Sequence, residues 1–484
     1  MQLREPTVTT DERAVSDDFT GDAWRRAALL GLAVFVWALL GIITRPGGHL
    51  AAFWPANALM LGALVRFPRL VSRPSWLTAA VGYIAADLIT GNTFTMTMLL
   101  TAANLSGVAM GYLAFGLVER DDRRLARPNA VLAVALVSAA ASAAAGVTGA
   151  IITIALYGGA FGTSWLLWFI TELLNYIVIL PVMLTFPQTF RWPASATGGS
   201  LAGHLLPFLA LIASTAAGMA VGGPGALAFP VPALLWCAIS YSLFTSSVLN
   251  LLFSAWSLLA IASGILHVTL DPQSGPTLLS IRLGINLIAL APLMVASAMQ
   301  ANAALLDRMS FMANHDPLTR LPNRISFSER AMQLLDDVAL ERRSVAMLML
   351  DIDRFKTIND SYGHQAGDRV LVAFARLLEA NVRQRDALAR MGGEEFAILL
   401  CDCTPEDATT VAERICRLFA EQPIDIGEAR WIHVTVSIGI STARQAPSEI
   451  GGLLQVADEA LYAAKDAGRN RVIMRDSMAT AAPR

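Results

Sequence analysis

Two carboxylates follow a short, strongly apolar segment in the second half of the chain. Residues 344–350 (SVAMLML) are typical of a buried central β-strand. Asp351 and Asp353 come directly after this segment and flank Ile352. Carboxylates at the end of a strand are well placed to bind Mg²⁺, which takes one or two protein carboxylates together with substrate phosphates. The spacing therefore predicts a metal site where this strand ends.

A second acidic pair stands in a glycine turn. The segment 387–400 (ALARMGGEEFAILL) places Gly392 and Gly393, then Glu394 and Glu395, between two apolar runs that predict β-strands. A hairpin uses turn glycines but does not require adjacent carboxylates. Glycines let a phosphate or a base approach the backbone without interference from a Cβ atom. Carboxylates from two neighbouring strands can share a pair of metal ions, which favours attack of a hydroxyl group on an α-phosphate.

The elements around these motifs predict an α+β domain. Strands are predicted at 344–350, 388–391, 396–400, 433–441 and 472–474, and helices at 369–382, 405–420 and 450–467. A further short helical segment follows the first strand. The resulting order β-α-α-β-β-α-β-α-β is that of a ferredoxin-like, palm-type sheet with additions. Such a sheet would bring the two acidic motifs together.

Composition divides the 484-residue chain into two parts. It is 55% hydrophobic and 15% charged, below the roughly 25% charged residues of soluble proteins. Only about 16 Asp, Glu, Lys and Arg residues lie between Leu29 and Met299, whereas the chain from Asp307 onward has the charge density of a soluble protein. A polytopic α-helical membrane domain is therefore predicted before the soluble domain. The four cysteines lack metal-site spacing and are expected to be reduced.

The apolar runs predict a multi-pass protein embedded in a lipid bilayer. About ten runs reach or approach the length of a membrane span: 27–44, 51–66, 76–91, 95–118, 129–156, 164–186, 202–221, 225–242, 244–266 and 277–299. Arginines gather in the loops around 66–73, 119–127 and Arg191, and the loops between them carry one arginine. Excess arginine marks the cytoplasmic side. Both termini are therefore expected in the cytoplasm, with an even number of spans.

Three charged residues lie inside these apolar runs. Asp87, Glu172 and Arg282 are accompanied by several asparagines. Charges within the membrane are costly unless paired and often mark functional sites. One interpretation is a structural ion pair or interhelical hydrogen bonding. The other is a sensory pocket that binds a small ligand or a proton.

The first part of the chain resembles the MASE1 integral-membrane sensory domain. The resemblance covers residues 25–300 and rests on the stretch FWPANALMLGALV (53–65), the paired spans and the loop arginines. It implies a sensory input module in the bacterial inner membrane that responds to an unknown ligand. A transporter is the competing interpretation, but the sequence shows no clear internal repeat with broken helices at matching positions.

Residues 307–476 resemble a GGDEF domain, the catalytic module of diguanylate cyclases. The resemblance is carried by DPLTRLPNR (316–324), DIDRFKTINDSYGHQAGD (351–368), GGEEF (392–396), VSIGIS (436–441) and ADEALYAAKDAGRNR (457–471). It implies that two GTP molecules, held by two copies of the chain, condense into cyclic di-GMP with release of two pyrophosphates. Each active site would hold two Mg²⁺ ions, with Mn²⁺ as a substitute. The resemblance implies no nucleic-acid partner.

The resemblance also implies roles for individual residues. Asp351 and Glu394 would hold Mg²⁺, with help from the Ile352 carbonyl. Glu395 would lie near the reacting 3′-hydroxyl, and Arg390 is grouped with these catalytic residues. The positions implied to contact GTP are Phe355, Lys356, Asn359, Asp368, Gly392, Gly393, Lys465 and Arg469. Within this set, Asn359 and Asp368 would bind the guanine edge.

Lysine is almost absent from the chain, which makes its two occurrences informative. Among 36 basic residues, only Lys356 and Lys465 are lysines. An ammonium is a compact point charge and a guanidinium a planar fork, so the two do not interchange at a tight phosphate site. Both lysines fall on implied phosphate-contacting positions. Unless this is a coincidence, it favours a working site.

A second nucleotide site is indicated by the motif RQRD. Arg383 and Asp386 match the family's inhibitory site for cyclic di-GMP, and Asp386 lies six positions before Gly392. Arginine can bind a phosphate or a guanine through two parallel hydrogen bonds, and a carboxylate can meet a guanine edge. The alternative is a chance match, because four-residue motifs are common.

The predicted organisation places a sensor before an enzyme. The domains are a cytoplasmic tail (1–26), a MASE1-like membrane domain (27–299), a signalling helix linker (300–315), the GGDEF domain (316–476) and a C-terminal tail (477–484). Leu305, Met309 and Met312 could form a short seam between the chains of a homodimer. Two alternatives remain: a catalytically silent receptor for GTP or cyclic di-GMP, and a transporter with a regulatory nucleotide domain.

Overall fold

The computed structural model describes residues 21–43, 53–187, 201–268, 275–340, 344–427, 429–443 and 449–476. The chain divides into two compact units, Met1–Ala304 and Leu305–Arg484. The first is helical and the second is built around a β-sheet. We refer to them as the helical unit and the sheet unit.

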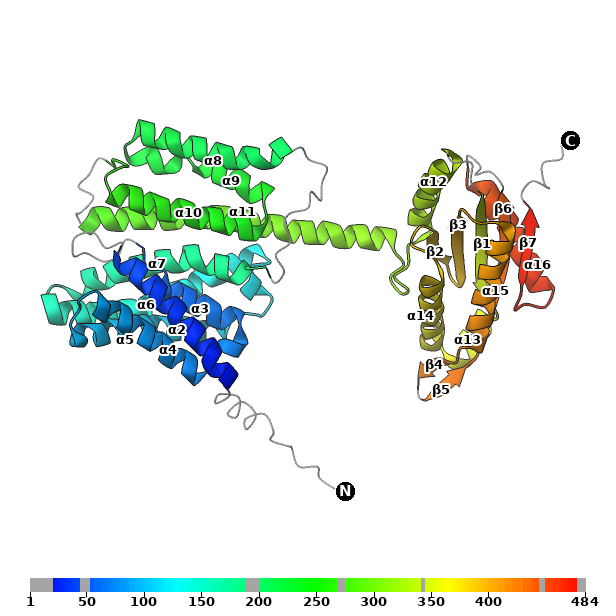
Figure 1. The fold of residues 1–484 in the computed structure, drawn as a ribbon, viewed down its shortest axis with the longest axis horizontal. Coiled ribbons are helices and arrows are strands. Elements are labelled where there is room, and N and C mark those ends of the chain that lie inside the picture. Colours follow the sequence, from blue (N-terminus) through cyan, green and yellow to red (C-terminus); the bar gives the residue numbers. More distant parts are fainter. Residues whose placement is uncertain are drawn as a thin grey trace, which may run out of the picture. The chain divides into compact units, whose positions relative to one another are not determined.

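The helical unit contains mostly long apolar helices (Figure 1). They are α2 (Gly21–Ile43), α3 (Ala56–Arg66), α4 (Arg73–Ile89), α5 (Phe94–Phe115), α6 (Pro128–Tyr157), α7 (Phe161–Thr185), α8 (Leu201–Val221), α9 (Val231–Ser240), α10 (Leu243–Ala262) and α11 (Gly275–Asn314), which continues beyond Ala304 into the sheet unit. Within the described residues, 6 helices are long and apolar enough to cross a membrane: α2, α5, α6, α7, α10 and α11. The chain therefore has the helices of a multi-pass membrane protein.

Two of the predicted spans are broken in the structure. In the run 51–66, the described residues Phe53, Trp54 and Pro55 are not helical and α3 has only 11 residues. In the run 225–242, a 3-10 helix precedes Pro230 and α9 has only 10 residues. Pro55 and Pro230 each occupy the N-cap of the short helix that follows, where the missing backbone N–H of proline costs no intrahelical hydrogen bond. An 11-residue helix is about 16 Å long, against roughly 30 Å of bilayer core, so neither helix spans a membrane alone. The even number of spans stays a prediction.

Small residues let the helices of this unit pack closely. α2 packs on α4, α6 packs on α5 and α7, and α3 contacts both α5 and α7. A Cβ atom at Gly31 of α2 would lie 2.6 Å from the carbonyl oxygen of Thr78 in α4. Close approach through small residues is typical of helices in membranes.

After the end of α11, the described residues of the sheet unit form a main sheet of five strands with five helices around it. Its elements are α12 (Arg324–Leu340), β1 (Val345–Ile352), α13 (Phe355–Tyr362), α14 (His364–Asn381), β2 (Ala387–Gly392), β3 (Glu395–Cys401), α15 (Pro405–Glu421), β4 (Ile424–Gly427), β5 (Arg430–Ile432), β6 (Val436–Ala443), α16 (Gly451–Asp466) and β7 (Val472–Asp476). The strand order is β2-β3-β1-β6-β7. All neighbouring pairs are antiparallel except β6 and β7, which are parallel.

The sheet lies between two helical layers. Alternate residues of β1, such as Leu348 and Leu350, pack with Phe374 of α14 and Phe419 of α15. The intervening residues, such as Met347, pack with α12 and α16. Every residue of β1 is buried, because both faces of this central strand are covered. The end of β1 is thus a rigid base for the residues that follow it.

The predicted fold class is confirmed: apolar helices precede an α+β domain with the expected element order. Helix α12 and the small hairpin of β4 and β5 were not predicted. The strand expected at 433–441 begins only at Val436, and the backbone N–H of Asp353 still donates to the carbonyl oxygen of Thr435 at 2.9 Å, one position beyond the last β1–β6 pair. All four cysteines are free and buried. Burial raises the pKa of Cys401, Cys403 and Cys416 to about 11, which keeps these thiols protonated and unreactive.

Candidate active site

The strand register brings the two acidic motifs together. β1 and β3 are antiparallel, and Asp351 lies opposite Glu395. One residue further along, the backbone N–H of Ile352 donates to the carbonyl oxygen of Glu394 at 3.4 Å. The backbone therefore holds the end of β1 against the turn between β2 and β3.

This turn depends on its two glycines. Gly392 has a φ angle of +150° and Gly393 of +51°, and the pairing of β2 with β3 shifts between Arg390 and Gly392. The left-handed conformation of Gly393 costs other residues about 1–2 kcal/mol. No described atom lies within 4 Å of the position that a Cβ atom would take at either glycine, apart from the immediate chain neighbours. The turn therefore leaves room for a ligand close to its backbone.

Two carboxylates are candidates for binding a metal, Asp351 and Glu394, and Asp351 is the more buried of them. It is 6% exposed, and its Oδ2 contacts Nζ of Lys465 at 2.8 Å. Burial raises the pKa of Asp351 to about 6. The ammonium of Lys465 lowers this pKa, and the charges of Glu394 and Glu395 raise it. The three carboxylates thus repel one another across the turn, which favours a cation between them.

The oxygen donors at the turn can supply part of the coordination shell of a hard divalent cation. Within the described residues, no group of three or more His, Cys, Asp or Glu side chains forms a closed metal site. The available donors are oxygens: the Asp351 and Glu394 carboxylates and the Ile352 carbonyl. Mg²⁺ is commonly bound in this way, with water and substrate phosphates completing the shell. The ammonium of Lys465 against Asp351 shows that a positive charge is favoured here.

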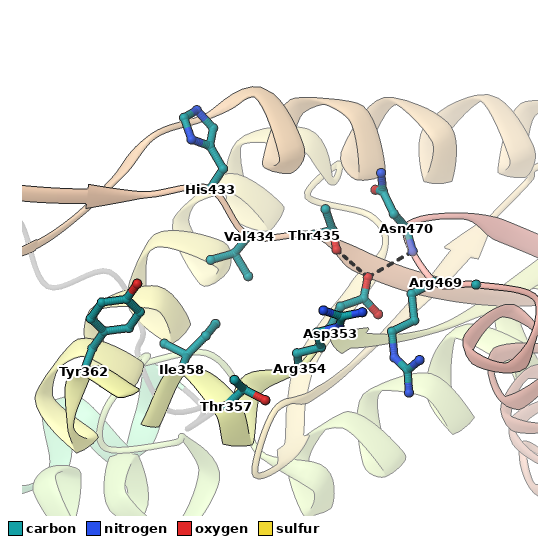
Figure 2. Close-up of a pocket in the computed structure, with 11 residues that line it drawn as sticks. Asp353, Arg354, Thr357, Ile358, Tyr362, His433, Val434, Thr435, Arg469 and Asn470 are labelled. Atoms are coloured by element: carbon teal, nitrogen blue, oxygen red, sulfur yellow. Dashed lines mark hydrogen bonds between the residues drawn. The ribbon is translucent and has the colours of Figure 1, made fainter. Parts of the chain in front are cut away.

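Asp353, by contrast, is fully engaged in holding the fold. It accepts hydrogen bonds from Thr435 Oγ1 at 2.7 Å, from Ser437 Oγ at 2.7 Å and from the backbone N–H of Asn470 at 3.0 Å. Figure 2 shows the bonds from Thr435 and Asn470. The two aspartates at the end of β1 therefore have different roles. Asp351 faces the turn, whereas Asp353 hydrogen-bonds the end of β1 to the start of β6 and to the segment after α16.

Arg390 contacts the turn from the strand that precedes it. Its Nε and Nη2 donate to the carbonyl oxygen of Gly393 at 2.9 and 2.6 Å, and its Nη1 donates to Asp316 Oδ1 at 2.8 Å. Asp316 also accepts two bonds from Thr319. Burial raises the pKa of Asp316, but the bonds from Thr319 and Arg390 outweigh burial and lower it below its ordinary value. These contacts make Arg390 a residue that positions the turn.

Asn359 offers a buried acceptor on the helix after β1. Its Oδ1 has no hydrogen-bond partner among the described residues. A Cβ atom at Gly367 of α14 would collide with this oxygen, so the glycine makes room for the amide. Asp368, the next residue, is exposed. A buried polar atom without a partner is uncommon and calls for an explanation such as a ligand.

A cavity of about 330 Å³ opens beside Asp353 (Figure 2). Thr357 and Tyr362 of α13 lie on one side, His433 on another, and Arg469 near the end of α16. Among the residues that line the cavity, Arg354, Arg469 and Asn470 have left-handed φ angles. Strained backbone of this kind tends to gather at ligand sites. The sequence singles out Asp353 and Arg469 separately, and nothing in it joins the segments that carry them and His433 into one cavity.

The comparisons with known proteins agree with this geometry. The family model described as "Diguanylate cyclase, GGDEF domain" matches residues 313–471. The probable diguanylate cyclase DgcF of Escherichia coli O157:H7 is 30% identical over 453 residues, which cover 92% of this chain and 92% of that protein. This chain belongs to the GGDEF diguanylate cyclase family.

One further relative and one solved structure each match a part of the cyclase. The probable diguanylate cyclase DgcF of Escherichia coli K12 is 34% identical over 309 residues, 63% of this chain and 95% of that protein. Among solved structures, the coiled coil and GGDEF domain of DgcB from Caulobacter crescentus, in complex with c-di-GMP, is 28% identical. That match has a TM-score of 0.34 and covers 36% of this chain and 92% of the other.

The RQRD motif of the cyclase forms a turn before β2. The backbone N–H of Arg383 donates to Asp386 Oδ2 at 3.2 Å, and Asp386 Oδ1 accepts from the N–H of Cys401 at 3.1 Å. Arg383 is exposed. Gly392 ends the strand that begins after Asp386, so the motif lies roughly 20 Å from the glycine turn. The two predicted nucleotide sites are therefore at opposite ends of one strand.

The three intramembrane charges of the cyclase each have a protein partner. Asp87 accepts from Asn92 Nδ2 at 2.9 Å, beyond the end of α4. Glu172 accepts from Asn57 Nδ2 at 3.0 Å. Arg282 of α11 donates to the hydroxyl of Thr171. Arg282 therefore bonds to the residue that precedes Glu172 on α7, whereas Asp87 bonds to a residue in the loop after α4.

Proposed function

We propose that this cyclase condenses two GTP molecules into cyclic di-GMP and releases two pyrophosphates. The proposal is carried by the meeting of Asp351, Glu394 and Glu395 at a glycine turn that is open to a ligand. The unpartnered oxygen of Asn359 adds an acceptor for the N–H groups of a guanine edge. Carboxylates for the metal ions that accompany a triphosphate, and a hydrogen-bond acceptor for a guanine base, are therefore both present near the end of β1.

We assign the metal to the oxygens of Asp351, Ile352 and Glu394. A divalent metal is general in GGDEF cyclases, and two Mg²⁺ ions per site, replaceable by Mn²⁺, would suit these donors. When bound, such ions neutralise phosphate charge and favour attack at the α-phosphate. Glu395 is exposed beside the turn, where it would accept the proton of the attacking 3′-hydroxyl.

The remaining assigned residues bind and orient GTP. Lys356, Lys465 and Arg469 supply positive charge for the triphosphate, and a lysine suits a tight phosphate contact as a compact charge. Asn359 and Asp368 would accept hydrogen bonds from guanine. Phe355, Gly392 and Gly393 would contact GTP through the backbone, and Arg390 would hold the turn in place through its bonds to Gly393.

Ring closure requires two GTP-loaded domains, so we propose a homodimer. The end of α11 carries Leu305, Met309 and Met312, which are 57%, 61% and 59% exposed. Their spacing of four and three residues places them on one face of the helix. Exposed apolar side chains in this pattern favour pairing with a second copy of the helix.

Product inhibition would act through Arg383 and Asp386. Both oxygens of Asp386 already accept backbone hydrogen bonds, and each retains a lone pair for a guanine edge. The guanidinium of Arg383 could bind a phosphate of cyclic di-GMP through two hydrogen bonds. Binding at this end of β2 would hold the two domains in an unproductive arrangement.

We further infer that the helical unit is a MASE1-like sensor in the bacterial inner membrane, with both termini in the cytoplasm. Arginines of the segments 66–73 and 119–127 support this orientation, while Arg191 lies outside the described residues. The proposed domains remain 27–299, 300–315 and 316–476. The proposed tails, 1–26 and 477–484, lie wholly or mostly outside the described residues.

The test is synthesis of cyclic di-GMP by the full-length protein in lipid nanodiscs with GTP and Mg²⁺. Glu395→Gln should reduce the formation of both cyclic di-GMP and pyrophosphate by about 10²–10⁴-fold, the size of effect typical of a positioned general base. Glu413→Gln is the matched control, because Glu413 is an exposed glutamate on α15.

Unchanged pyrophosphate release by Glu395→Gln would contradict the assignment. A wild-type protein that binds GTP but forms no product would instead identify a catalytically silent receptor.

A further inference from the structure

A second cluster of polar side chains lies inside the helical unit, where the proposed reaction does not use it. Its centre is Asn57, which is 0% exposed. Asn57 Oδ1 accepts from the Tyr83 hydroxyl at 2.7 Å and from Trp54 Nε1 at 3.3 Å. Its Nδ2 donates to Asn104 Oδ1 at 3.1 Å and to Glu172 Oε2 at 3.0 Å. An amide has two acceptor positions and two donor hydrogens, so Asn57 is fully bonded.

Glu172 is bonded less completely than Asn57. It is 3% exposed, and among the described residues Asn57 is its one hydrogen-bond donor. Glu172 is also the only charged residue in the sequence of α7, and α5, α6 and α10 contain none. The ionisable residues on the surrounding helices are Arg66 of α3, Arg73, Tyr83 and Asp87 of α4, Tyr112 of α5, Tyr157 of α6, Tyr176 of α7, Asp122, Arg123 and Arg124 of the 3-10 helix η2 (Asp122–Arg124), and Arg282, Asp307 and Arg308 of α11.

An unpartnered hydroxyl group points to the same region. Tyr176 lies four residues after Glu172, on the same face of α7. Its hydroxyl is buried and has no hydrogen-bond partner among the described residues. A Cβ atom at Gly107 would lie 3.3 Å from this hydroxyl, and Gly107 follows Asn104 by three residues on α5. The Tyr176 hydroxyl therefore faces the part of α5 that carries Asn104.

We propose that this cluster binds a small monovalent cation, either a proton on Glu172 or a sodium ion between Glu172, Asn104 and Tyr176. Carboxylate, amide and hydroxyl oxygens are the ligands that hard cations prefer. A carboxylate buried within a membrane is costly when it is charged, and a bound cation removes this cost. The unused acceptor capacity of Glu172, together with the free hydroxyl of Tyr176, distinguishes this cluster from a closed structural network.

The cluster is also placed to influence the helix that leaves this unit. Arg282 of α11 donates to Thr171, the residue before Glu172, and α11 continues to Asn314. A cation that binds better in one arrangement of α7 and α11 would shift the population toward that arrangement. This coupling rests on the proposed function, whereas cation binding itself does not.

The direct test is thermal unfolding of the full-length protein in nanodiscs, followed by tryptophan fluorescence. Of 10 tryptophans only Trp431 lies in the sheet unit, so the signal mainly reports the helical unit. One arm replaces choline with sodium at constant pH, and the other lowers the pH without sodium. Binding stabilises the folded state, and an ion at 100 times its Kd should raise the midpoint by about 5–10 °C.

Variants decide whether the response belongs to this cluster. Glu172→Gln should lose the response, while Glu119→Gln, which alters an exposed loop carboxylate, should keep it. A sodium response identifies sodium and a pH response identifies a proton. No response in either arm, or a normal response in Glu172→Gln, overturns the proposal. If Glu172→Gln does not fold, Tyr176→Phe takes its place, and an unchanged half-saturating sodium concentration or pH then overturns the proposal.

Cyclic di-GMP synthesis in the same nanodiscs tests the coupling. Its rate should change severalfold with the same ion in wild type and should not change in Glu172→Gln. Ion-dependent unfolding with an ion-independent rate would refute the coupling and leave the binding site supported. Absence of synthesis under every condition would refute the proposed function, and the unfolding data would still decide whether the cation site exists.

Discussion

Asn57 in the helical unit and Asn359 in the sheet unit show how differently the two units use a buried amide. Asn57 has partners at every donor and acceptor position. Asn359 keeps Oδ1 without a partner among the described residues, beside a glycine that makes room for it. A fully bonded amide specifies the fold around it, whereas an unbonded one is prepared for a ligand.

The same contrast separates the places where the two units could bind ligands. Near the end of β1, the sheet unit exposes a glycine turn and a cavity of about 330 Å³, which suits a large, highly charged substrate. Around Asn57, most polar groups of the helical unit bond to one another, and among the described residues the Tyr176 hydroxyl and part of the Glu172 carboxylate stay without a partner, which suits a small ion. The following predictions test this division, beginning with the largest expected effect.

Asp351→Asn should reduce cyclic di-GMP synthesis by about 10³-fold, or roughly 4 kcal/mol in activation free energy. Asp351 contributes the buried charge that Glu394 and Glu395 face across the turn. The substitution removes repulsion among these carboxylates, so the folded state should not be destabilised. Steady-state kinetics and thermal unfolding check the two halves of this prediction. Asp336→Asn, at an exposed position of α12, should behave as wild type, and an active Asp351→Asn enzyme would contradict the metal assignment.

Asn57→Ala should destabilise the helical unit by about 2–3 kcal/mol. It leaves Tyr83, Asn104 and Glu172 without a buried partner, and each lost partner carries a desolvation cost. Tryptophan fluorescence during thermal unfolding in nanodiscs measures the change. Asn92→Ala alters an amide at the loop after α4 that donates to Asp87, and should cost less. Equal stability of wild type and Asn57→Ala would show that the polar cluster does not hold these helices together.

Asp353→Asn should weaken the sheet unit by about 2 kcal/mol, because three donors lose part of a carboxylate acceptor. Hydrogen–deuterium exchange should show faster opening of β1 and β6 peptides. Activity per folded molecule should fall far less than in Asp351→Asn. An opposite ranking, with Asp353→Asn the less active and more stable enzyme, would exchange the roles assigned to these two residues.

The role of Asp353 also shows where reading the sequence was insufficient. Its partners Thr435, Ser437 and Asn470 lie more than 80 residues further along the chain. No local spacing could separate it from Asp351, two positions away. The cavity beside it has the same origin, since its walls come from segments that meet only in the folded sheet.

Other features were predictable because they depend on local patterns. The apolar run before Asp351 predicted the central strand, and the glycines after Met391 predicted the turn of the hairpin. Apolar length predicted the long helices but not the broken ones, because a hydrophobicity count ignores how Pro55 starts a new helix. Asn359 was identified by its resemblance to a family position, whereas its unpartnered oxygen became visible only in the structure.

Asn359→Ala should raise the KM for GTP about tenfold, equivalent to roughly 1.4 kcal/mol, with little change in stability. The substitution removes an acceptor that has no partner to lose in the free protein. Asn381→Ala, which removes an amide bonded to the carbonyl of Leu377 in the last turn of α14, should leave KM unchanged. A large loss of stability in Asn359→Ala with normal KM would make this amide structural, like Asn57, and would remove the contrast between the two units.

The smallest effect is the pH dependence that Asp351 gives to stability in magnesium-free buffer. Burial raises its pKa from 3.8 to about 6 in the folded state, so the folded protein holds this proton more tightly than the unfolded chain. The stabilisation is complete below about pH 4 and is lost as the pH rises through about 6. Solvent screening reduces the full shift to about 1 kcal/mol. Chemical unfolding near pH 5 and near pH 8 should therefore show wild type losing about half of this amount relative to Asp351→Asn, because the other half is already lost below pH 5. Parallel behaviour of the two proteins would mean that Asp351 is charged throughout this range.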